Sequence, residues 1–125
     1  MLQASGEGPV PTELRLSADK TTLRISFVDG LDAEFPAELL RVESPSAEVQ
    51  GHSPSERKLV PGKRLVTILS IEPVGNYAVR LVFSDGHHTG IYSWVYFHEL
   101  ARNKDVVWRA YLDRLQAASL SRDLV

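Results

Sequence analysis

"LRISFVDGLDAEFPAELL" (residues 23–40) and "VRLVFSDGHHTGIYSWVY" (residues 79–96) align without a gap when Arg24 is placed on Arg80. In both stretches an alternating apolar segment leads into an Asp-Gly dipeptide, a second short segment and a run with helical character. Alternation is typical of a half-buried strand, and Asp-Gly favours a tight turn because glycine tolerates a positive φ. The pair predicts two related units, each with the order strand, turn, strand, helix.

The fold expected for the whole chain is α+β: a mostly antiparallel β body built from these two units, with a C-terminal helix. Strands are predicted at residues 13–17, 22–28, 31–35, 65–74, 77–83 and 88–93, and helices at residues 36–42 and 94–102. Ser93 is expected to cap the second helix. Alternation places these side chains on the inward faces: Leu23, Ile25 and Phe27, and then Tyr77, Val79, Leu81 and Phe83.

A further, separate helix is predicted near the C-terminus, with Asp105 in its first turn, where a negative charge favours the helix dipole. It is indicated by an apolar stripe at helical spacing, made of Trp108, Tyr111, Leu112 and Leu115.

The 125 residues fit one domain with a single core. Residues 1–12 are expected to form a flexible N-terminal tail, residues 13–118 the folded domain, and residues 119–125 a frayed C-terminus. Residues 43–64 lack periodicity and predict a long loop. The basic residues of this loop are expected to be a solvated cluster, or else to bind an anion or a partner: Arg57, Lys58, Lys63 and Arg64.

The composition excludes several classes of function. The chain has no cysteine, so disulfides, thiolate catalysis and cysteine-ligated zinc or iron–sulfur centres are excluded within it. A net charge of −2 argues against nucleic-acid binding. The N-terminus lacks a signal-peptide pattern and no apolar run is long enough to span a bilayer, so a cytoplasmic protein without membrane contact is expected.

The histidines are the first candidates for a metal site. His87 and His88 are neighbours on a predicted strand, so their side chains should point to opposite faces. His98 lies on the following helix and His52 in the long loop, and no H-x-x-x-H spacing occurs. The spacing therefore predicts no metal and no cofactor.

Known catalytic motifs are missing as well. The sequence has no G-x-S-x-G, no Walker A loop and no G-x-G-x-x-G. Asp85, His87 and Ser93 could be assembled into a triad, but any domain of this size offers such a triple. The sequence therefore predicts no enzyme activity.

Aromatic side chains cluster where the last predicted strand meets its helix. They can pack in the core, or form an exposed patch for a protein partner, since Tyr and Trp are enriched at interfaces. Under the second interpretation the partner-binding candidates are His87, His88, Tyr92, Trp94 and Tyr96.

The run "DGHHTGIYSWVYFHEL" (residues 85–100), with "FVDGLDAEFPAELLRVESPS" (residues 27–46) and "RKL" (residues 57–59), resembles a known family. It is similar to the N-terminal domain of gamma-butyrobetaine hydroxylase and trimethyllysine hydroxylase, and the resemblance covers about residues 11–115. Short stand-alone bacterial proteins share this domain of unknown function. In plants it is also joined to P-loop iron–sulfur carrier proteins.

The resemblance implies a structural zinc held by three cysteines and one histidine in the hydroxylases. His87 stands at the histidine position, while Ser44, Ser46 and Val49 stand where the cysteines would be. Serine and valine cannot replace thiolates on zinc, so the resemblance implies a lost site with His87 as a remnant.

The hydroxylase activity belongs to a separate catalytic domain and is not carried over. The resemblance thus favours a non-catalytic accessory or interaction domain, with an iron–sulfur carrier as a candidate partner. The alternative is an iron- or zinc-binding protein that uses His87, His88 or His98, and a third possibility is a ligand binder with an unrecognised pocket. The oligomeric state is open.

Overall fold

The computed structural model describes residues 8–123, which form two three-stranded antiparallel sheets and a set of helices. The first sheet has the order β2-β3-β4, with β2 (Pro11–Leu16), β3 (Thr22–Phe27) and β4 (Asp32–Pro36). The second has the order β5-β6-β7, with β5 (Ile68–Val74), β6 (Ala78–Phe83) and β7 (Ile91–Ser93). The helices are α1 (Ala37–Val42), α2 (Ala47–Gln50), the 3-10 helix η1 (Pro54–Glu56) and α3 (Trp94–Ala117). The predicted α+β class is confirmed.

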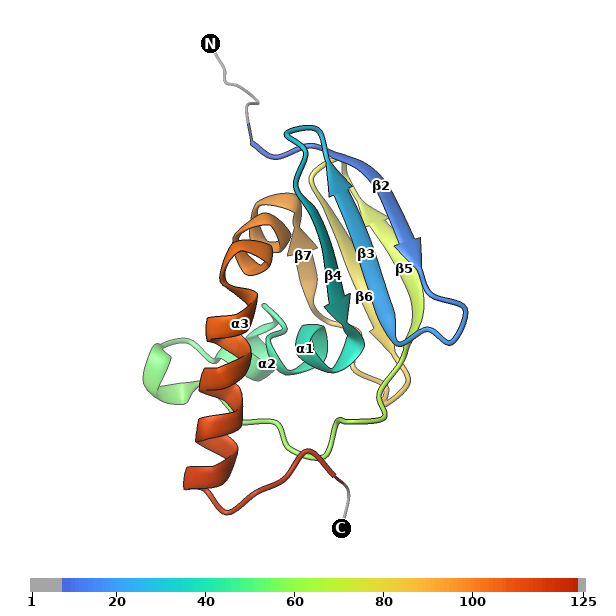
Figure 1. Cartoon of the computed structure of the whole chain (residues 1–125). Helices are drawn as coiled ribbons and strands as arrows, with labels where there is room; N and C mark the ends of the chain where they lie inside the picture. Colours follow the sequence, from blue (N-terminus) through green and yellow to red (C-terminus); the bar gives the residue numbers. More distant parts are fainter. Residues whose placement is uncertain (1–7, 124–125) are drawn as a thin grey trace.

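The core lies between the two sheets and under the first half of α3. Figure 1 shows the first sheet lying over the second, with α3 running along the side of β4 and β7. The alternation of the sequence is realised, because one buried cluster joins Leu23, Ile25 and Phe27 of β3 to Val79, Leu81 and Phe83 of β6. The prediction for Tyr77 is wrong, since this residue lies before β6 in a turn and is 56% exposed.

The first Asp-Gly turn joins β3 to β4. The Phe27 N–H donates to the Leu31 carbonyl at 2.8 Å, and Asp29 Oδ1 accepts from the Leu31 N–H at 3.0 Å. Gly30 adopts a φ of 94°, which explains the glycine.

The second turn, after β6, repeats this geometry. The Phe83 N–H donates to the His87 carbonyl at 2.9 Å, Asp85 Oδ1 accepts from the His87 N–H at 3.0 Å, and Gly86 has a φ of 92°. The repeat found in the sequence is therefore a repeat of structure, with Leu31 and His87 at equivalent positions.

The C-terminal helix differs from the prediction. Residues 94–117 form one continuous helix of 24 residues, so Asp105 lies in its middle rather than in a first turn. No Gly or Pro interrupts it, and the Asn103 amide donates to the Glu99 carbonyl within the helix. The predicted cap is confirmed, because Ser93 Oγ accepts from the Tyr96 N–H at 3.0 Å.

The predicted long loop is more ordered than the sequence suggests, since it contains α2 and η1. Three of its basic residues form ion pairs within the domain: Arg57 with Glu43, Lys63 with Asp85, and Arg64 with Asp123. The Arg57 and Lys63 pairs join the loop to the body of the domain through enclosed carboxylates, whereas Arg64 pairs with Asp123 at the surface and stays largely solvated.

Several predicted boundaries shift. The strand predicted at residues 65–74 begins at Ile68, and the strand predicted at residues 88–93 begins at Ile91. Strand β2 begins at Pro11, inside the expected tail. The carbonyls of Ser121 and Arg122 accept backbone hydrogen bonds from the 62–64 segment, which differs from a frayed end. The predictions for residues 1–7 and 124–125 fall outside the described residues.

Candidate functional site

His87 is buried, with 7% of its surface exposed, and it contacts the segment that follows α1. Its Nε2 lies 2.9 Å from Ser44 Oγ, and its Nδ1 lies 3.3 Å from a carboxylate oxygen of Glu48. A carboxylate can only accept, so the ring proton belongs on Nδ1 and Nε2 accepts from the Ser44 hydroxyl. The structure therefore brings His87 and Ser44 into direct contact.

The other two positions implied by the resemblance lie in the same segment. Ser46 Oγ lies 2.6 Å from Thr89 Oγ1 and also caps α2 by accepting from the Glu48 N–H. Val49 is buried. The segments around Ser44 and Gly90 pack so closely that a Cβ on Gly90 would lie 2.5 Å from Ser44 Oγ. Hydrogen bonds and close packing thus hold together the residues at the implied ligand positions.

This set of side chains does not fit zinc. It offers one imidazole, two hydroxyls and one hydrocarbon in place of three thiolates and an imidazole. The other histidines lie elsewhere: His88 is exposed and bonds through Nδ1 to the Gly86 carbonyl, and His98 pairs with Asp29. Within residues 8–123, no group of three or more His, Asp or Glu side chains is placed to hold a metal ion.

Ser44, His87 and Glu48 have the order of contacts found in a serine–histidine–acid triad. Ser44 is completely buried, however, so no substrate carbonyl can reach its Oγ, which also accepts from the Ser46 N–H at 3.2 Å. Burial, and then the charge of Arg41, lower the pKa of His87 and favour its neutral form. The cluster therefore supports the fold.

The aromatic candidates divide between core and surface. Tyr92 is fully buried, and its hydroxyl donates to the Leu40 carbonyl at 2.5 Å, so it cannot contact a partner. Burial also raises its pKa. Tyr96 is half-buried, donates to the Glu43 carbonyl and has its pKa raised by burial to about 12. Trp94 is half-buried, and its indole N–H donates to the Asn76 carbonyl.

Only Trp94 of these candidates lies beside a set of exposed apolar side chains, which we call the apolar end. Two hollows of about 350 and 470 Å³ adjoin here and share residues 8–10. The apolar end consists of Val10, Val28, Tyr77, Trp94 and Val95. Four of these residues are about half exposed or more. Figure 1 shows this region where the chain enters β2, near the β3–β4 turn and the start of α3.

Most of this surface was not predicted from the sequence. Val10 fell in the expected tail, and Tyr77 was assigned to the core. A usable signal was the pair Gly75-Asn76, which predicts a turn and so places the next residue at the end of the sheet.

The fold and these clusters define a small α+β domain with a buried histidine network and an exposed apolar end. A model of the family "Gamma-butyrobetaine hydroxylase-like, N-terminal" matches residues 14–98, more than half of the chain. The chain belongs to this family, which confirms the resemblance seen in the sequence. No curated protein matches.

Solved structures support the same assignment. Two structures determined by NMR in solution are 43% and 48% identical, with TM-scores of 0.80 and 0.79. They cover 93% and 98% of this chain, and 91% of each of their own chains is covered. A crystal structure from Acidithiobacillus ferrooxidans, of a protein with unknown function in the DUF971 family, is 37% identical with a TM-score of 0.61. The match covers 73% of this chain and 91% of the chain in the crystal structure.

Across the part of the chain that the structure describes, no helix is long and apolar enough to cross a membrane.

Proposed function

We propose that this chain is a non-catalytic, cytoplasmic protein-interaction domain that binds its partner through the apolar end. The observation that carries the proposal is the gathering of Val10, Val28, Tyr77 and Val95 around Trp94. Contiguous exposed apolar side chains cost free energy in water, and covering them by a partner recovers it.

The apolar end differs from the surface predicted from the sequence. Trp94 is retained, because its ring lines one hollow of the apolar end. Tyr92 and His87 are excluded by burial, and His88 is exposed beside the other Asp-Gly turn, at Gly86. Tyr96 faces a different groove, between α3 and the segment that follows α1.

An iron–sulfur carrier is the first partner to test. The support is the resemblance to domains that are joined to P-loop iron–sulfur carriers, since domains fused in one chain often act together in others. Such a partner would place the domain near the maturation of metalloproteins, without a metal of its own.

Binding of the purified chain to a purified P-loop iron–sulfur carrier, measured by isothermal titration calorimetry, tests the proposal. Val28→Glu combined with Val95→Glu should lower the affinity at least tenfold, since it puts two charges on the apolar end. Val106→Glu combined with Leu69→Glu is the matched control, because it adds the same two charges at residues that are 72% and 51% exposed and do not line either hollow. Equal affinities of both variants for the carrier would refute the apolar end as the binding surface. Absence of binding by the wild type would refute the carrier as the partner.

The metal-binding alternative is tested separately. Elemental analysis of the purified wild type and of His87→Ala should find no stoichiometric zinc or iron in either protein. A stoichiometric metal in the wild type that is lost in His87→Ala would restore that alternative.

A further inference from the structure

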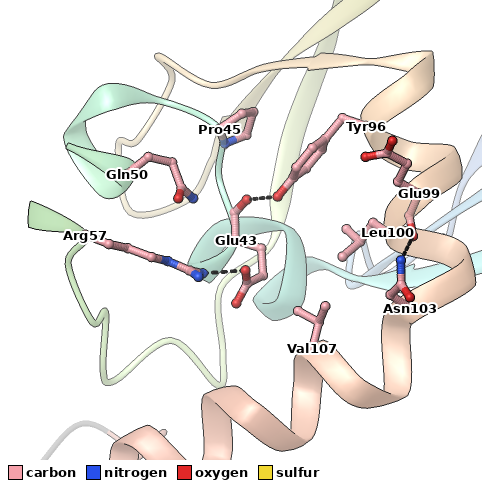
Figure 2. Close-up of a pocket in the computed structure, with 9 residues that line it drawn as sticks. All are labelled: Glu43, Pro45, Gln50, Arg57, Tyr96, Glu99, Leu100, Asn103 and Val107. Atoms are coloured by element: carbon pink, nitrogen blue, oxygen red, sulfur yellow. Dashed lines mark hydrogen bonds and ion pairs between the residues drawn. The ribbon is translucent and has the colours of Figure 1, made fainter. Parts of the chain in front are cut away.

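Two buried glutamates, Glu38 on α1 and Glu43 at the end of α1, each pair with an arginine. Both glutamates are 5% exposed. Figure 2 shows the second pair, in which Arg57 reaches one carboxylate oxygen of Glu43 from the residue that follows η1. The donor for Glu38 is Arg122, which lies beyond the last helix. The Glu38 pair therefore depends on the chain that follows α3, whereas the Glu43 pair does not.

Arg122 binds Glu38 through a bidentate ion pair. Its Nε donates to Glu38 Oε2 at 2.9 Å, and its Nη2 donates to Oε1 at 2.7 Å. The guanidinium also lies over the ring of Trp108, with 5.1 Å between Cζ and the ring centroid. A planar cation with a fork of N–H donors matches this carboxylate and this ring, whereas an ammonium is a compact point charge. Glu38 and Trp108 therefore form a site that suits a guanidinium.

The main chain around Arg122 is bound as well. The Gly62 N–H donates to the Ser121 carbonyl at 2.9 Å. The Arg64 N–H donates to the Arg122 carbonyl at 3.0 Å, and the Arg64 guanidinium pairs with Asp123. The site therefore holds an arginine within a peptide segment, together with the acidic side chain that follows it.

Residues 118–123, which we call the strap, have no regular secondary structure. They leave α3 through Ser119, whose φ of 56° is unusual for a residue other than glycine. Leu120 is 44% exposed, so it adds little packing against the core. A hollow of about 150 Å³ borders Arg122, and 29% of the Arg122 side chain is exposed. Few buried apolar contacts and solvent-accessible hydrogen bonds favour local opening of such a segment.

We propose that Glu38, Trp108 and residues 62–64 bind a segment of a partner protein in which an arginine precedes an acidic residue, and that the strap occupies this site in cis. Glu38 has no other cationic partner among residues 8–123, and a buried carboxylate without a counter-charge is costly. A partner arginine restores that charge when the strap opens. The strap competes with the partner, so it is an autoinhibitory contact.

The peptide acetyl-Leu-Ser-Arg-Asp-amide, which repeats residues 120–123, tests the proposal by NMR titration of the ¹⁵N-labelled chain. Arg122→Ala, checked for folding by circular dichroism, frees the site and should give saturable shifts at Gly62, Arg64 and the Trp108 indole. The wild type should bind about tenfold more weakly, as expected if the strap is open about one-tenth of the time. Saturable shifts in neither protein overturn the site, and shifts in Arg122→Ala alone overturn displacement of the strap.

The specificity of the site is tested with the same peptide carrying lysine in place of arginine. It should bind Arg122→Ala at least about fivefold more weakly, because an ammonium cannot form the bidentate pair. Equal affinities for the two peptides would show a non-specific charge effect and overturn the guanidinium site. Arg102→Ala is the matched control, since it removes the same charge from an exposed position of α3 and should bind like the wild type.

Hydrogen exchange of the wild type tests opening of the strap without any substitution. The amides of Gly62 and Arg64 donate to the strap, so they should exchange through a local opening that is insensitive to low concentrations of urea. Exchange of these amides through global unfolding alone would overturn the proposal. Figure 1 shows the strap at the end of the domain opposite the apolar end, so either site can fail alone.

Discussion

The two Asp-Gly turns share one backbone geometry, but they face different tertiary partners. In the first, Asp29 Oδ2 lies 2.8 Å from Nε2 of His98 on α3. In the second, Asp85 Oδ2 accepts from Arg41 on α1 and from Lys63, both at 2.7 Å. The turn of each unit is therefore contacted by the helix of the other unit: α3 contacts the first turn and α1 the second.

One local motif thus acquires two electrostatic roles. Asp29 is exposed, and its pKa is lowered by the Leu31 N–H and then by His98. Asp85 is more enclosed, where burial alone would raise its pKa, but Lys63, the His87 N–H and Arg41 together lower it to about 2. The second turn is held by permanent cations, whereas the first is held by an imidazole.

The largest difference between the two turns is expected in the free energy of unfolding when the charge of each aspartate is removed. Asp85→Asn keeps an acceptor for the His87 N–H but leaves Arg41 and Lys63 without a counter-charge, and should cost about 2–3 kcal/mol. Asp29→Asn should cost much less, because solvent screens the exposed pair with His98. Urea denaturation at neutral pH measures both, and equal losses would contradict the asymmetry.

Acid should act mainly through the second turn. Because the pKa of Asp85 is depressed in the folded state, its contribution is present above about pH 4 and is lost as the pH falls from about 4 to about 2. The expected loss is about 1–2 kcal/mol after allowance for solvent screening. Denaturation at a series of pH values should show this loss in the wild type and in Asp29→Asn, but not in Asp85→Asn.

The glycines should reveal what the turns have in common. Gly30 and Gly86 both have a positive φ, and a Cβ at either would meet nothing within 4 Å. Gly30→Ala and Gly86→Ala should each cost about 1 kcal/mol, purely from backbone conformation. A clear difference between the two in thermal or urea unfolding would show that the turns are not equivalent.

The smallest effect concerns the residue after each turn, Leu31 in the first and His87 in the second. Burial lowers the pKa of His87, so the unfolded chain binds its proton more readily and stability falls as the pH drops below about 6.5. His87→Gln should remove this pH dependence, while His88→Gln, at an exposed histidine, should keep it. The free energy of unfolding of the wild type and both variants, measured between about pH 7.5 and about pH 5.5, tests this prediction. Identical pH profiles for the three proteins would refute the assignment of the pH dependence to His87.

Much of the architecture could be predicted from the sequence. The strand alternation, the two turns and the Ser93 cap depend on neighbours within a few residues, and they occur where predicted. The break expected in the C-terminal helix was wrong, because no local residue terminates it. The site was predicted less well, since Tyr92 proved to be core and the apolar end joins segments far apart in the sequence.

What the sequence by itself determined is the family, the class of fold and the absence of cysteine. These depend on residue identity and short-range periodicity, which require no knowledge of long-range contacts. Only the tertiary structure decided that Ser44 and Glu48 hold His87, that the helices hold opposite turns, and that Arg122 pairs with Glu38. Such contacts join residues distant along the chain, so they arise from packing and not from any local pattern. The pair "HH" at residues 87–88 shows the difference, because the first histidine is buried and the second is exposed.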